Sequence, residues 1–305
     1  MLENIFYNNE FTYFEKKIHF EKKILLIGKG EILKKAYFFL KKIFEIEYLV
    51  TNENELFGEE TKIIELMKLN NIQEIEKYNI ILACKYEERA EFIQEIRTDK
   101  YICYSLTPFE IIMEELEKRE EKINEYKVLD MFGGTGFYQT QYYYDKVKEI
   151  EIWEYDEKNI NILREKFVEA RVFQGDSYEK IKKCKEKFDM IVVDNFIEMF
   201  DKHCEHFDIF PDIFKVLKEK SILVLNVVPE ASKEILEKRK NLFKENQLIE
   251  RKKFYESEIG NNIPISKMIK KYSEIAKENG FYIKWAFAVQ RSFLFNLVIK
   301  VEKIC

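Results

Sequence analysis

Residues 128–136 read Val128-Leu129-Asp130-Met131-Phe132-Gly133-Gly134-Thr135-Gly136, an apolar run that ends in an acid and enters a glycine-rich loop. This loop holds three of the nine glycines in the chain. Glycine adopts positive φ readily and lets backbone N–H groups come close to a bound molecule. Between a strand and a helix, such a loop is typical of pockets for nucleotide-like molecules.

Strands and helices alternate in the residues that follow this loop. Apolar and polar residues alternate over 149–153, as expected of a half-buried strand, and a β-branched run precedes Asp194. Alternation of strand and helix gives a mostly parallel α/β sheet. The pattern predicts helices at 138–146 and 157–167 and strands at 149–154, 171–176, 188–194 and 222–229.

Four acids stand at the predicted carboxyl ends of these strands, namely Asp130, Glu154, Asp176 and Asp194. The carboxyl ends of parallel strands share one edge of the sheet, where ligands of open α/β sheets bind. A single acid at a strand end is usually a turn former, whereas four in order behind a glycine loop indicate a binding site. Glu154 also lies close to the spacing of about 20 residues at which an acid binds ribose hydroxyls in dinucleotide folds.

The segment from about residue 126 to 230 resembles the class I S-adenosylmethionine (SAM)-dependent methyltransferases, and more narrowly their spermidine-synthase-like branch. The motifs that carry the resemblance are VLDMFGGTGF, WEYDEKNI, VFQGDSYE, FDMIVVDNF and ILVLNVVP, in this order. It implies a Rossmann-like α/β domain with an antiparallel last strand, and binding of SAM or decarboxylated SAM. Phe132 stands where many methyltransferases have Gly, a variant that also occurs in this class.

The same resemblance implies roles for individual residues. Asp130 and the loop glycines are expected to hold the amino-acid part of the cofactor, Glu154 the ribose hydroxyls and Asp176 the adenine amine. Asp194 is expected to face the reacting sulfonium and is the candidate catalytic residue, since an acid there can accept the proton of an amine. The expected cofactor-binding residues are Asp130, Phe132, Gly133, Gly134, Gly136, Glu154, Tyr155, Asp176, Ser177 and Asp194.

Two transfer reactions remain open. Spermidine synthases use decarboxylated SAM and carry a second acid soon after the position of Asp194, but here the next acid is Glu198. The segment 194–212 is nonetheless strongly acidic, with Lys202 its only Lys or Arg, and could attract a polyamine. We expect a SAM-dependent methyltransferase acting on a small amine, which could be cationic, with aminopropyl transfer as the alternative. A non-catalytic nucleotide-binding protein is a further alternative.

The first hundred residues predict a second, smaller α/β unit. An apolar run at 23–27 enters the turn Gly28-Lys29-Gly30, and further strands are expected at 47–50, 79–84 and 101–104. This segment loosely resembles the small Rossmann-like domains of sugar-modifying and nucleotide-binding proteins. Leu33 occupies the third glycine position of G-x-G-x-x-G, which argues against dinucleotide binding here. An enzyme that uses NAD or a nucleotide sugar in this unit is a minor alternative.

Helix-start signals locate the domain boundary. Residues 107–110 read Thr-Pro-Phe-Glu, a capping box with Pro at the first helical position. We expect an N-terminal domain at 1–106, a helical linker at 107–125 that could join a homodimer interface, and a SAM-binding domain at 126–305. A lysine-rich helical insert at about 230–264 and a terminal hairpin at 281–289 and 292–301 complete this last domain.

The length of 305 residues and the composition agree with a soluble, two-domain enzyme, for which we expect a small-molecule substrate. The net charge of −5 argues against nucleic-acid binding, which requires a basic face. No apolar run approaches the roughly 18 residues of a membrane helix, and the first residues do not read as a secretory signal. Five scattered cysteines fit a reducing cytoplasm. His203 and His206 lack a second ligand cluster, so no metal site is expected.

Overall fold

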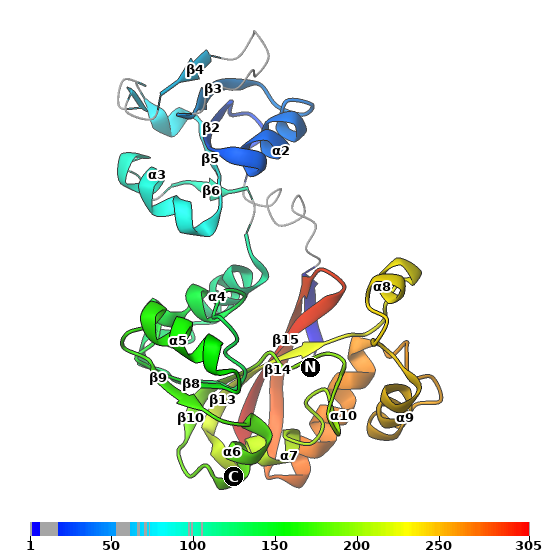
Figure 1. Ribbon diagram of the computed structural model, residues 1–305. Helices are drawn as coiled ribbons and strands as arrows, with labels where there is room; N and C mark the ends of the chain where they lie inside the picture. The colour runs from blue at the N-terminus through cyan, green and yellow to red at the C-terminus, as the bar shows by residue number, and fades with distance from the viewer. Residues whose placement is uncertain are drawn as a thin grey trace. The chain divides into compact units, whose positions relative to one another are not determined.

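The computed structural model describes residues 2–6, 18–52, 62–65, 68–69, 72, 74–96, 98, 100–104 and 106–304 (Figure 1). The chain divides into two compact units, Met1–Tyr7 with Pro108–Cys305 and, separately, Asn8–Thr107. No helix in the described part of the chain combines the length and the apolarity that crossing a membrane requires.

The larger unit is built on an eight-stranded sheet, counted over the described residues, in the order β1-β14-β15-β13-β10-β7-β8-β9. Strand β15 is antiparallel to its neighbours β13 and β14, and all other neighbouring pairs are parallel. This topology confirms the predicted Rossmann-like α/β fold with an antiparallel last strand. The strands are β1 (Leu2–Phe6), β7 (Lys127–Asp130), β8 (Glu149–Glu154), β9 (Arg171–Gln174), β10 (Phe188–Val193), β13 (Leu217–Val227), β14 (Phe281–Arg291) and β15 (Leu294–Lys303).

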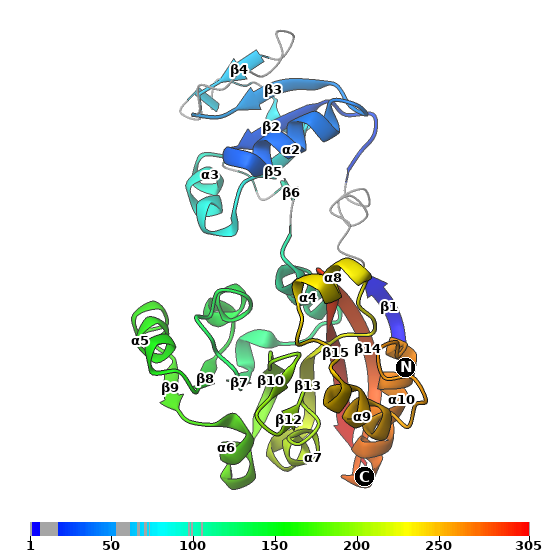
Figure 2. The same ribbon diagram turned by 45° about the vertical axis from the view of Figure 1, so that its right-hand side comes forward.

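Helices cover both faces of this sheet (Figures 1 and 2). Helix α4 contacts β14 and β15 and helix α5 contacts β8 and β9, while α10 packs against β14. Because both faces are covered, the central strands are apolar almost throughout, as is usual in parallel sheets. The helices are α4 (Pro108–Lys118), α5 (Glu157–Lys166), α6 (Ser177–Lys183), α7 (Phe210–Ile213), α8 (Lys233–Lys238), α9 (Glu245–Phe254) and α10 (Ile265–Glu278).

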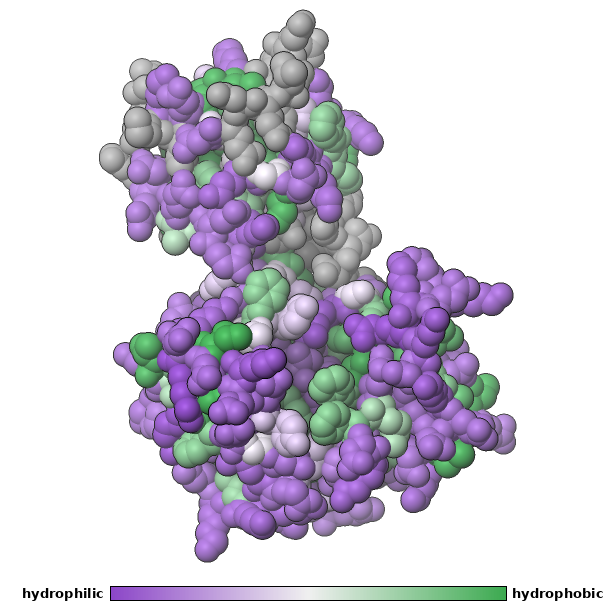
Figure 3. All heavy atoms as spheres, viewed as in Figure 1, coloured by the Kyte–Doolittle hydropathy of each residue, from purple (hydrophilic) through white to green (hydrophobic). Residues whose placement is uncertain are grey.

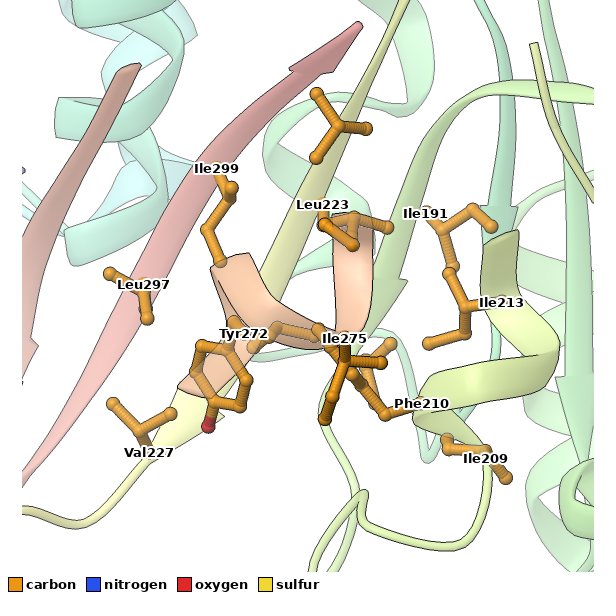
Figure 4. Close-up of a cluster of buried hydrophobic side chains, with 14 of the residues drawn as sticks. Ile191, Ile209, Phe210, Ile213, Leu223, Val227, Tyr272, Ile275, Leu297 and Ile299 are labelled. Atoms are coloured by element: carbon orange, nitrogen blue, oxygen red, sulfur yellow. The ribbon is translucent and has the colours of Figure 1, made fainter. Parts of the chain in front are cut away.

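The main core lies between the sheet and helices α7 and α10 (Figure 4). Alternate side chains of each strand enter it, because successive side chains of a strand point to opposite faces. Burying each of these Leu, Ile and Phe side chains contributes about 1.5–3 kcal/mol. The labelled members are Ile191, Leu223, Val227, Leu297 and Ile299 from the strands, with Ile209, Phe210, Ile213, Tyr272 and Ile275 from the helical side.

The structure differs from the predicted domain limits at both ends of the small unit. Strand β1 pairs with β14, Phe6 opposite Val289, so the start of the chain belongs to the larger sheet and not to a domain of residues 1–106. The helical linker expected at 107–125 belongs to the larger unit as helix α4, where Phe109, Ile112 and Leu116 are buried on one side of the helix. The charged residues between them concealed this apolar face, which repeats every three to four residues.

The helix predicted at 138–146 is absent from the described structure, which has two 3₁₀ turns, Thr140–Tyr142 and Tyr144–Lys146, in its place. The hydroxyls of Thr140 and Tyr143 both donate to the Asp130 carboxylate, and these bonds fix the segment in an irregular path. Its β-branched and aromatic residues are also weak helix formers, so tertiary contacts decide its conformation.

The smaller unit has a five-stranded sheet within the described residues, in the order β4-β3-β2-β5-β6, with every pair parallel. Gly28 at the end of β2 passes so close to β5 that a Cβ would lie 2.0 Å from the Ala83 carbonyl oxygen. This contact explains the glycine without a ligand. The elements are β2 (Ile24–Gly28), α2 (Gly30–Leu40), β3 (Ile46–Val50), β4 (Lys62–Ile64), β5 (Asn79–Ala83), α3 (Arg89–Ile96) and β6 (Ile102–Cys103).

Candidate functional site

Two adjoining pockets open where β7, β8 and β10 end, and they share Phe132, Gly134, Asn159, Asp194 and Phe196. The first, here termed the loop pocket, has a volume of about 380 Å³. It is lined by Asp130, Phe132 to Thr140, Asn159, Asp194 to Ile197, Asn226, Arg239, Arg291 and Leu294. The second, termed the aromatic pocket, measures about 360 Å³ and is lined by Met131, Phe132, Gly134, Trp153 to Asp156, Asn159, Asp176 to Tyr178, Asp194, Phe196 and Phe200.

The glycine loop forms the floor of the loop pocket and packs directly on β8. The backbone N–H of Gly133 donates to the Trp153 carbonyl oxygen at 3.0 Å, and that of Gly134 donates to Glu154 Oε2 at 2.6 Å. A Cβ on Gly133 would lie 2.4 Å from Ile152 Cγ2, so only glycine fits there. Gly134 has a φ of +52° but nothing within 4 Å of a Cβ. The loop therefore keeps open backbone at its tip.

Replacing Gly133 by alanine is expected to lower the free energy of unfolding by about 2–3 kcal/mol, because the new methyl group overpacks against Ile152 and Leu163. Gly134→Ala is the matched control and should cost only about 1 kcal/mol, for the left-handed backbone alone. Urea unfolding followed by tryptophan fluorescence measures both, since Trp153 and Trp285 lie in the larger unit. Equal losses in the two variants would contradict the packing argument.

Asp130 is buried at the wall of the loop pocket and has one carboxylate oxygen to spare. Oδ2 accepts hydrogen bonds from the hydroxyls of Thr140 at 2.6 Å and Tyr143 at 2.7 Å, while Oδ1 is buried without a partner among the described residues. Burial raises the pKa of Asp130 to about 6, and the Asp194 charge adds a smaller effect in the same direction. Hydrogen bonds from the two hydroxyls and from the backbone N–H of Phe132 oppose this shift. A buried acceptor without a partner indicates where a donor of a ligand fits.

Glu154, Tyr155, Asp176 and Ser177 all line the aromatic pocket, as the predicted site requires. Glu154 Oε1 accepts the backbone N–H of Asp156 at 2.8 Å, so both of its oxygens help to fix the loops around it. Asp176 caps α6 by accepting the backbone N–H of Tyr178 at 2.9 Å. The Ser177 hydroxyl is buried and donates to the Met131 carbonyl oxygen, which makes its role structural.

Exposed aromatic side chains flank the aromatic pocket. Tyr155 and Phe196 are 66% and 64% exposed, and Phe200 packs beside both of them. The rings of Phe196 and Phe200 are nearly parallel, with centroids 5.4 Å apart. Apolar residues reach the surface in the middle of the larger unit, within a mainly hydrophilic face (Figure 3). Such rings provide a surface on which a flat heterocycle stacks. Phe196 and Phe200 were not among the predicted site residues.

Asp194 lies where the two pockets meet, and its carboxylate is held from two sides. Arg291 Nη1 donates to Oδ2 at 2.9 Å, and Asn226 Nδ2 donates to Oδ1 at 3.1 Å. The Arg291 guanidinium also stands over the Tyr138 ring, 4.9 Å from its centroid. Arg291 ends β14, far along the chain from Asp194, and the sequence showed it only as part of a hairpin turn. Arg291 and Asn226 were not among the predicted site residues.

Most acids of the segment 194–212 are paired with basic side chains. Glu198 pairs with Arg239, Glu205 with the buried Arg251, and Asp208 with His203. Asp212 pairs with Lys215 on the next helical turn. Among the described carboxylates of this segment, Asp194 is the one that lines the pockets. At the described pockets, the structure therefore offers a polyamine only Asp194 from this segment.

The helical insert fixes the segment that follows Asp194. On α9, Gln247 Nε2 donates to the Ile197 carbonyl oxygen at 2.7 Å, and Arg251 pairs with Glu205 while fully buried. Arg251 also donates through Nε to the Gly260 carbonyl at 2.6 Å and through Nη2 to the Val228 carbonyl at 2.7 Å. The sequence indicated only a lysine-rich surface helix, because a single buried arginine gives no periodic signal.

The two neighbouring histidines serve packing. His203 stacks on Tyr178 with a ring distance of 3.8 Å, and His206 is fully buried with Nε2 at 2.8 Å from the Tyr272 hydroxyl. Burial lowers the pKa of His206 to about 3, so its ring is neutral. His203 belongs to the short strand β12 (His203–Cys204), which pairs with β11 (Met199–Phe200). Within the described residues, no three His, Cys, Asp or Glu side chains group as metal ligands do.

Comparison with known proteins gives no family match and no curated relative. Similar solved structures include Trm1 of Pyrococcus horikoshii with S-adenosyl-L-methionine, at 13% identity and a TM-score of 0.44 over 65% of this chain and 56% of that one. TYW2 of the same organism in complex with MeSAdo has 13% identity and a TM-score of 0.38 over 63% and 62% of the two chains. Magnesium protoporphyrin IX methyltransferase of Synechocystis with bound SAH has 12% identity and a TM-score of 0.42 over 64% and 81%. At these values the similarities assign neither family nor function.

Proposed function

We propose that the larger unit is a SAM-dependent methyltransferase that acts on a small amine. The observation that carries the proposal is the pair of adjoining pockets at one sheet edge, which joins the glycine loop, Glu154, Asp176 and Asp194. This edge is the usual ligand site of open α/β sheets. The similarity of residues 126–230 to class I methyltransferases predicts the same four positions as the cofactor site.

The residues present fit an adenosyl cofactor. In the aromatic pocket, Tyr155 and Phe196 offer faces for a purine, and Glu154 ends β8 where a ribose diol can donate to its carboxylate. In the loop pocket, the unpartnered Oδ1 of Asp130 can accept from an ammonium group, beside the open backbone of Gly134. An ammonium would also offset the cost of ionising Asp130, whose pKa burial has raised.

When bound, SAM supplies an electrophilic methyl carbon on a cationic sulfur. The residues of the chain then have to hold an amine nitrogen in line with the sulfur–carbon bond, which is catalysis by orientation. Asp194 lies at the junction of the two pockets, and Arg291 and Asn226 fix its carboxylate. It can accept the proton that the amine loses as the nitrogen–carbon bond forms and the sulfur–carbon bond breaks.

The acceptor proposed here is small, and its amine would share the loop pocket of about 380 Å³ with the amino-acid part of SAM. It need not be a polycation. Among the acids of residues 194–212, Asp194 is the one that lines the described pockets, and it is itself paired with Arg291.

Isothermal titration of the full chain tests the proposal. SAM and its demethylated product, S-adenosylhomocysteine, should both bind, at one site per chain, and Glu154→Ala should weaken both about tenfold or more by removing the ribose acceptor. NAD serves as the comparison ligand and should not compete. Binding of NAD without binding of either adenosyl compound would contradict the proposed function.

A further inference from the structure

Two arginines line the loop pocket that were not among the expected site residues, Arg239 and Arg291. Arg291 ends β14, and Arg239 follows α8, so two separate elements bring their guanidinium groups to one pocket. Their side chains are 23% and 48% exposed. Asp130, with its unpartnered oxygen, lines the same pocket. Arg239 pairs with Glu198 at 3.6 Å and Arg291 with Asp194 at 2.9 Å, each through one guanidinium nitrogen. Their remaining N–H groups are the donors that the loop pocket offers to an anion, and Asp130 is its acceptor for a cation.

Arg291 can bind a second hydrogen-bond acceptor besides Asp194. One of its N–H groups donates to Asp194, and a guanidinium carries five such donors in a planar fork. Its face lies over the Tyr138 ring and Arg239 stands over Phe293, at 4.9 Å and 5.2 Å from the ring centroids. Because these contacts already restrict both side chains, little rotamer freedom is left to lose when an anion binds.

We propose that Arg291, assisted by Arg239, recognises a carboxylate and thereby makes this site select SAM over decarboxylated SAM. The inference rests on the proposed function and decides between its two transfer reactions. SAM carries a carboxylate that can accept charge-assisted hydrogen bonds from the guanidinium groups. Decarboxylated SAM lacks this group, so it cannot accept these hydrogen bonds. The chain is therefore a methyltransferase and not an aminopropyltransferase.

Titrating the full chain with SAM and with decarboxylated SAM tests this selectivity, and does so without any acceptor. The wild type should bind SAM at least about tenfold more tightly, about 1.4 kcal/mol. Arg291→Gln should weaken SAM about tenfold and leave decarboxylated SAM unchanged, since this ligand has no carboxylate. Arg291→Lys keeps the charge but not the fork and should retain part of the preference. Arg164→Gln, on the exposed side of α5, is the matched control and should change neither affinity.

Each outcome separates the inference from the function on which it rests. An equal loss of both ligands in Arg291→Gln would overturn the inference, because a merely structural arginine would affect them alike. A selectivity unchanged in the double variant R239Q/R291Q would also overturn it. That result would leave SAM binding, and hence the proposed function, intact. Failure of the wild type to bind either sulfonium or 5′-methylthioadenosine would remove both.

Discussion

Replacing Asp194 by asparagine is expected to lower kcat by roughly 100- to 1,000-fold, the contribution usual for a general base, while SAM affinity stays within about threefold. Asparagine has nearly the same shape and can still accept the hydrogen bond from Asn226, but it cannot take up a proton. The fold should survive, because the carboxylate is only partly buried. Transfer of a labelled methyl group from SAM to a panel of small amines, together with titration of SAM, measures both quantities.

The control for this substitution is Asp201→Asn in the same acidic segment. Asp201 is exposed and has a φ of 53°, which asparagine adopts as readily as aspartate. The activity of the Asp201→Asn variant should equal that of the wild type. Full activity in Asp194→Asn would sink the assigned role and would favour either another base or a binding protein without this chemistry.

Replacing Arg251 by methionine is expected to lower the free energy of unfolding by about 3–5 kcal/mol, because the buried Glu205 then loses its counter-charge. Four further contacts disappear with the guanidinium, two to backbone carbonyls and two to the rings of Phe243 and Tyr255. Glu205 also has a left-handed backbone, with a φ of 50°. Urea unfolding followed by tryptophan fluorescence reports this loss in the larger unit.

Two comparisons make this prediction specific. Lys238→Met breaks the exposed ion pair with Glu234 on α8 and should change stability by less than about 1 kcal/mol. Glu205→Gln added to Arg251→Met should recover part of the loss, because no buried charge then stays uncompensated. If the single and double variants were equally unstable, the loss would stem from packing and not from the unpaired carboxylate.

Local sequence signals determined most of the larger fold. Strands β7 and β10 were readable because their central residues are apolar and buried, and β8 because apolar and polar residues alternate along it. An acid ends β7 and β8 and follows β10, at the same edge of the sheet. The glycine loop was readable from its three glycines. The structure explains one of them, because a Cβ on Gly133 would collide with Ile152. Asp130, Glu154 and Asp194 stand at the ends of these three strands, Asp176 comes after β9, and all four line the pockets.

Contacts between distant segments decided the rest. Strand β1 joins β14 across the whole chain, and the path of residues 138–146 depends on hydroxyl bonds to Asp130. Arg291 meets Asp194, and Arg251 meets Glu205, through pairings that leave no periodic pattern in the sequence. The sequence by itself determined which strand ends carry acids, because burial and turn chemistry act over a few residues. Only the tertiary structure decided which of those charges is compensated, since a charge is neutralised by whatever group the fold brings beside it.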